Sequence, residues 1–90
     1  MRKKRATHGE TIRSEVLRLR RQKPFQPFEL TLTDGRRLPI RQPNNIGFDP
    51  GEDQGRKGSL EFCVISGDIR FVGSFETVAE VVSIHKGDVP

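Results

Sequence analysis

Apolar residues near the start of the chain recur at helical spacing. Ile12, Val16 and Leu19 are separated by four and three positions, which places them on one stripe of a helix. Polar and charged residues fill most of the positions between them. The pattern predicts a helix over residues 11–22 whose apolar stripe packs on the rest of the domain.

Both ends of this helix carry recognisable signals. Thr7-x-x-Glu10 has the form of a capping box, and Thr11 is a second candidate for the N-cap. Pro24 restricts the residue before it, so the helix is expected to end there. Residues 24–28 contain two prolines and two phenylalanines. We expect a stiff connector whose aromatic rings attach the helix to a sheet.

The pattern then changes to a period of two, which is typical of a half-buried strand. Phe28, Leu30 and Leu32 face one way, and polar residues alternate with them. Asp34-Gly35 predicts a β-hairpin with a type I′ turn, because that turn needs positive φ at both central residues.

The return strand is expected over residues 36–42. Leu38 and Ile40 would lie on its inner face, and Arg37 and Arg41 on the outer one. Pro39 has no backbone N–H to donate, so this strand is predicted to be an edge strand or to contain a bulge.

Strand-like segments continue through the second half of the chain. Residues 46–48 indicate a short strand or a buried bend, and residues 49–59 indicate a mobile surface loop. The apolar run 60–65 predicts a strand that is buried on most of both faces. Further strands are expected over residues 69–73 and 78–84, the last one after one helical turn around residues 76–79.

These elements predict an α+β fold. An N-terminal helix packs on a strongly twisted antiparallel sheet of about five strands, or on a small, partly open barrel. The chain's 90 residues correspond to one domain. We expect residues 1–9 to form a disordered basic arm and residues 10–90 to form the single domain. Hydrophobic residues make up only 32% of the chain, so the core is thin and self-association would supplement it.

Charge is distributed unevenly along the chain. Residues 1–23 hold nine basic and two acidic residues, a net charge of +7, whereas residues 24–90 hold seven basic and ten acidic residues, a net charge of −3. Such asymmetry suggests a basic arm that meets phosphates or an acidic partner. The candidate contacts are Arg2, Lys3, Lys4, Arg5, Arg13, Arg20, Arg21, Lys23, Arg36, Arg37 and Arg41.

Each basic group also has a simpler interpretation. The basic residues of the N-terminal segment are equally typical of a solvated helix preceded by a tail that keeps the chain soluble. The three arginines of the hairpin are equally typical of an edge strand that is protected against sheet-to-sheet association. The chain has no Tyr or Trp, which argues against a stacking platform for single-stranded nucleic acid.

The sequence contains no recognisable catalytic constellation. Cys63 is the one cysteine and lies between Phe62 and Val64, so we expect a small buried hydrophobe rather than a nucleophile. His8 and His85 have no metal-ligand spacing. We therefore expect no enzyme and no cofactor. The single cysteine and the lack of a long apolar run predict a cytoplasmic protein that does not enter membranes.

The segment from Pro24 to Pro43 carries a family resemblance. Its Pro-Phe-Gln-Pro-Phe run, its Asp34-Gly35-Arg36 hairpin and its Ile-Arg-Gln-Pro exit resemble those of a group of small bacterial proteins with no assigned activity. In that group a short helix precedes the same elements. The resemblance covers residues 12–48 and implies a fold but no function.

A second resemblance concerns the run from Leu30 to Arg36. It is similar to the first motif of Sm-like RNA-binding proteins, in which a helix precedes a five-stranded barrel. Pro39 and Ile40 replace the glycine region of that family, and its RNA-gripping Asp and Asn are not matched in place. The resemblance therefore implies a shared hairpin, and the RNA site is not carried over.

Three functions remain as hypotheses. The first is a non-catalytic interaction module that binds protein partners, a second copy of the chain among them, through a strand edge or groove. The second is a nucleic-acid-binding protein that uses the basic arm and helix. The third is an enzyme whose site the sequence does not reveal.

Overall fold

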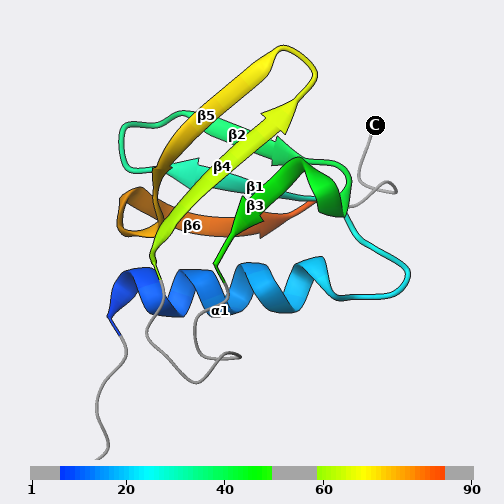
Figure 1. Cartoon of the computed structure of the whole chain (residues 1–90), viewed down its shortest axis with the longest axis horizontal. Coiled ribbons are helices and arrows are strands. Elements are labelled where there is room, and N and C mark those ends of the chain that lie inside the picture. Colours follow the sequence, from blue (N-terminus) through cyan, green and yellow to red (C-terminus); the bar gives the residue numbers. More distant parts are fainter. Residues whose placement is uncertain (1–6, 50–58, 85–90) are drawn as a thin grey trace, which may run out of the picture.

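Helix α1 (His8–Arg20) lies along one side of two three-stranded sheets (Figure 1). The computed structural model describes residues 7–49 and 59–84. The strands are β1 (Phe28–Leu32), β2 (Arg37–Ile40), β3 (Ile46–Phe48), β4 (Glu61–Ser66), β5 (Ile69–Ser74) and β6 (Val78–Ser83). Two short 3-10 helices, η1 (Pro43–Asn45) and η3 (Phe75–Thr77), precede β3 and β6.

All strand pairs are antiparallel. The first sheet has the order β2-β1-β6, and the second has the order β3-β4-β5. The chain crosses from one sheet to the other through η1 and returns through η3. The predicted α+β fold with a helix on an antiparallel sheet is confirmed. The described part of the chain has six strands in two sheets rather than about five in one, and these do not close into a barrel.

The capping box sets the start of α1. Thr7 is the N-cap, and its hydroxyl accepts a hydrogen bond from Glu10 N at 3.1 Å while Glu10 Oε1 accepts one from Thr7 N at 2.9 Å. The helix therefore begins at His8, one turn before the predicted start at Thr11. Residues 7–9, which we expected in the basic arm, form the cap and the first turn, and residues 1–6 lie outside the described residues.

The hairpin between β1 and β2 is present, but its turn differs from the predicted one. Gly35 has φ +94°, whereas no described non-glycine residue has positive φ, which excludes a type I′ turn. Leu32 N donates to Arg36 O at 2.8 Å and Gly35 N donates to Leu32 O at 2.9 Å. The loop thus contains three residues, and glycine occupies its left-handed position. Thr33 is the additional loop residue, although its alternation with the apolar residues had predicted it in the first strand.

The edge position predicted for Pro39 is confirmed. Pro39 lies opposite Glu29 in the register of β2 with β1, and β2 has no neighbour on its other side in the first sheet. The missing N–H of this proline therefore does not interrupt a sheet. Leu38 and Ile40 are buried and Arg37 is exposed, as the alternation predicted.

The core lies between α1 and the inner faces of the two sheets. The helical stripe of Ile12, Val16 and Leu19 is buried, which confirms the periodicity. The remaining core side chains are Phe28, Leu30, Leu32, Leu38, Ile40, Ile46, Phe62, Val64, Phe75 and Val78. Phe25 packs against this cluster, with its ring 6.0 Å from that of Phe28. The described part of the chain includes no helix long and apolar enough to span a membrane.

The strand predicted over residues 60–65 is buried on one face only. Phe62 and Val64 point into the core, whereas Cys63 is exposed and Ile65 is 57% exposed. The predictions of a strand buried on both faces and of a buried Cys63 are therefore wrong. The physical reason is that the core covers only the inner face of the second sheet.

Candidate functional site

Arg13 is a structural residue rather than a surface contact. Its side chain is only 3% exposed, and its Nη1 donates to Ser59 O at 2.9 Å. This bond connects the middle of α1 to the segment that leads into β4. The prediction that Arg13 contacts phosphates or an acidic partner is therefore wrong, because the guanidinium is buried.

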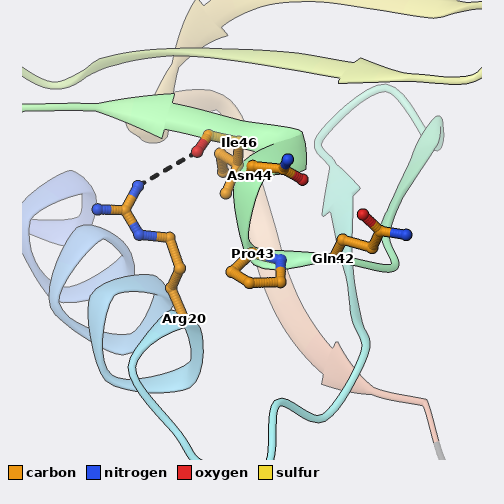
Figure 2. A pocket seen from close by; sticks show the side chains of 5 residues that line it. All are labelled: Arg20, Gln42, Pro43, Asn44 and Ile46. Atoms are coloured by element: carbon orange, nitrogen blue, oxygen red, sulfur yellow. Dashed lines mark hydrogen bonds between the residues drawn. The ribbon is translucent and has the colours of Figure 1, made fainter.

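Arg20 also has a role within the fold. Its Nη1 donates to Ile46 O at 3.2 Å, and its guanidinium carbon lies 4.7 Å from the centroid of the Phe48 ring. Figure 2 shows the side chain reaching from α1 to the start of β3, beside an open groove of about 570 Å³. Gln42, Pro43 and Asn44 complete the lining of this groove. The Ile46 carbonyl group faces outward at the edge of β3, and Arg20 is its hydrogen-bond donor.

Arg36 is exposed but lies beside a carboxylate. Asp34 Oδ1 accepts from Arg36 N at 3.0 Å, and Asp34 Oδ2 accepts from Arg36 Nε at 2.9 Å. The hydrogen bond from the Arg36 backbone N–H is the main reason that the pKa of the Asp34 carboxyl lies below its ordinary value. The side-chain hydrogen bond and the positive charge of Arg36 lower this pKa as well. The guanidinium carbon of Arg36 also lies 5.2 Å from the centroid of the Phe71 ring.

The other basic candidates are exposed where the structure describes them. Arg37 and Arg41 flank Pro39 at the edge of the first sheet, and Arg21 and Lys23 follow the end of α1. Arg2, Lys3, Lys4 and Arg5 lie outside the described residues. Arg13, Arg20 and Arg36 thus contact other parts of the fold, and the basic helix does not present all of its arginines to a ligand.

The outer face of the second sheet is a feature that sequence reasoning missed. Val72 is 74% exposed and Ile65 is 57% exposed. Cys63, also exposed, is directly opposite Val72 in the β4–β5 register, and Arg70 is opposite Ile65. The signal was available in β5, where Arg70 and Val72 alternate with Ile69 and Phe71. The uninterrupted apolar run of β4 concealed it.

The hairpin that carries this face projects away from the helix. In Figure 1 the loop between β4 and β5 lies at the top of the molecule, on the side opposite α1. This loop consists of Gly67 and Asp68, and Gly67 has φ +59° whereas Asp68 does not have positive φ. Glycine in the first loop position is the arrangement of a type II′ turn.

The turn fixes which backbone groups of β5 face outward. The two residues that flank a two-residue loop form a hydrogen-bonded pair, and such pairs alternate along an antiparallel hairpin. Ile69, Phe71 and Gly73 therefore bond to β4, and Phe75 N extends the series by donating to Leu60 O at 2.8 Å. The N–H and C=O groups of Arg70 and Val72 point away from β4, along the outer edge of the sheet.

Among the described residues, the other three sheet edges each have a feature that opposes strand addition and that β5 lacks. β2 contains Pro39, and β3 has only three residues, with the carbonyl oxygen of Ile46 hydrogen-bonded to Arg20. β6 has a register shift against β1, and His8 Nε2 lies 2.6 Å from the Val78 carbonyl oxygen. β5 is six residues long, contains no proline, and pairs with β4 without a register shift.

The described residues contain no group of three or more His, Cys, Asp or Glu side chains that could hold a metal ion. No family model, no curated protein and no solved structure matches this chain.

Proposed function

We propose that this chain is a non-catalytic interaction module that binds an extended segment of a protein along β5. The observation that carries the proposal is Val72, which is 74% exposed in the middle of a six-residue edge strand that has neither a proline nor a register shift. Exposed apolar residues on a long edge strand favour pairing with another strand. The backbone groups of Arg70 and Val72 supply the hydrogen bonds, and the outer side chains supply contact.

The side chains of this surface suit an extended apolar segment. Val72 and Ile65 offer aliphatic contact, and Cys63 adds a small soft group next to Val72. Arg70 is the one cation on this outer face and lies near the loop between β4 and β5. Glu61 is on the same face at the other end of the hairpin. An apolar centre between two opposite charges selects the direction in which a segment lies.

The nucleic-acid hypothesis has less support from the described residues. Arg13 is buried, Arg20 binds a backbone carbonyl and Arg36 is paired with Asp34. The remaining exposed candidates lie on two different elements, the end of α1 and the edge of the first sheet. Nuclease treatment separates the two hypotheses, because only nucleic-acid-mediated association is lost on digestion.

Replacing Val72 by lysine should abolish partner binding without unfolding the domain. A lysine on an edge strand opposes strand addition, and a substitution at so exposed a position changes the free energy of unfolding by at most about 0.5 kcal/mol. The measurement is recovery of proteins by the tagged full chain from a lysate of the cells that express it. Val82→Lys is the matched control, because Val82 is 40% exposed on the other sheet.

The expected result is a set of proteins retained by the wild type and the V82K variant, lost by V72K and unchanged by nuclease. Identical recovery by all three forms would contradict a binding site at β5. Loss of all recovered proteins on nuclease treatment would replace this proposal with nucleic-acid binding.

A further inference from the structure

We infer that the strand added to β5 is the β5 strand of a second copy of this chain, in an antiparallel pair centred on Val72. This inference rests on the proposed function and names its partner. A two-fold pair requires one patch to complement itself. The outward residues Arg70, Val72 and Ser74 meet that requirement, because reversing their order about Val72 places Arg70 of each copy opposite Ser74 of the other.

The hydrogen-bonding groups match in this register. Val72 faces outward in both copies, so its N–H and C=O groups exchange hydrogen bonds with those of the same residue in the second copy. The pair joins two three-stranded sheets into one continuous sheet of six strands. A register centred on Arg70 would instead place two like charges directly opposite each other, which is unfavourable.

Charge complementarity favours the second copy as the occupant. Glu61 is opposite Ser74 in the β4–β5 register, so Glu61 and Arg70 of the second copy lie on either side of Ser74. Two interstrand spacings separate their Cα atoms, about 10 Å, which long Arg and Glu side chains bridge over a small serine. The two-fold axis produces this opposite-charge pair twice.

The inner face of β5 also complements itself. In this register Phe71 lies opposite Gly73 of the second copy. A Cβ atom on Gly73 would approach the Phe71 ring of its own chain to 2.5 Å, so this ring already lies over Gly73. The Phe71 ring therefore fills the place of a Gly73 side chain, and in the pair it would lie next to the Phe71 ring of the second copy. Arg36, next to Phe71, is paired with Asp34 and adds no uncompensated charge.

Thiol cross-linking tests this geometry with the full chain. In a Cys63→Ser background, Val72→Cys places two thiols opposite each other across the two-fold axis. Val82→Cys in the same background is the control, because it puts a thiol on an exposed position of the other sheet. The shortest bismaleimide reagent is added over a concentration series, and covalent dimer is measured on a denaturing gel.

The V72C variant is expected to form roughly tenfold more covalent dimer than V82C, because pairing raises the effective concentration of its thiols. The native Cys63 thiols lie three interstrand spacings apart, about 14 Å, so only a longer reagent should join them. Equal cross-linking of V72C and V82C, or cross-linking only when the two variants are mixed, would overturn the pairing of β5 with itself.

Light scattering of the wild-type chain at high concentration completes the test, with a dimer expected. A monomer whose captured partners are still lost in V72K would overturn only the self-pairing. A monomer with no V72K-sensitive partner would overturn the proposed function as well.

Discussion

Replacing Phe75 by alanine lowers the free energy of unfolding by about 3–5 kcal/mol. Phe75 is completely buried. Its ring stacks on Phe62 with centroids 4.6 Å apart and meets Phe48 edge-on at 5.3 Å. Its backbone N–H also bonds to Leu60, so the residue fixes the point at which the chain returns from the second sheet to the first. Truncation leaves a cavity between the sheets and α1.

Denaturant unfolding followed by far-UV circular dichroism measures this loss. A loss of that size is a large fraction of the stability of a small domain, so the alanine variant is expected to be partly unfolded. Phe75→Leu keeps most of the volume and gives a measurable transition at a smaller loss. A loss below about 1 kcal/mol for F75A would show that Phe75 does not occupy the core.

Replacing Arg13 by alanine lowers the free energy of unfolding by about 2 kcal/mol. The variant loses a charged hydrogen bond to Ser59 O, for which a cost of about 1.5–3 kcal/mol is typical, and the packing of the buried aliphatic stem. Arg13→Met retains the stem and should recover part of the loss, because the exposed Ser59 segment has water available for its carbonyl group.

Arg37→Ala is the matched control for this prediction. Arg37 is exposed, so its removal should change stability by less than about 0.5 kcal/mol. The same denaturant titration compares the three variants. If R13A were as stable as the wild type and instead weakened binding to an anionic polymer, Arg13 would be a surface ligand contact and the buried placement would be wrong.

Local periodicity was sufficient for the elements that have one buried face and a polar opposite face. The stripe of Ile12, Val16 and Leu19 and the alternation in β1 each identified the side that meets the core. The capping box was also visible, although a second threonine at position 11 competed with it. These signals depend on neighbours within a few positions, which is why they can be found in the chain.

The candidate site depended on contacts between distant segments. The burial of Cys63 and Ile65 depends on whether another segment packs on the outer face of the second sheet. An apolar run in the sequence does not indicate whether such a segment exists. Arg13 lies 46 positions from its hydrogen-bond partner, so nothing near it in the sequence distinguishes it from a solvated arginine. The extra residue in the first hairpin loop likewise follows from how β1 and β2 pair.

Hydrogen exchange of individual β5 amides tests most directly whether this edge is an open binding strand. The amides of Arg70 and Val72 should exchange fast in dilute solution and slow as the chain concentration rises. The Phe71 amide, which is bonded to β4, should stay protected throughout. In V72K the Arg70 amide should remain fast at every concentration. Arg70 and Val72 amides that exchange at one rate across the whole series, with or without a captured partner, would contradict the account.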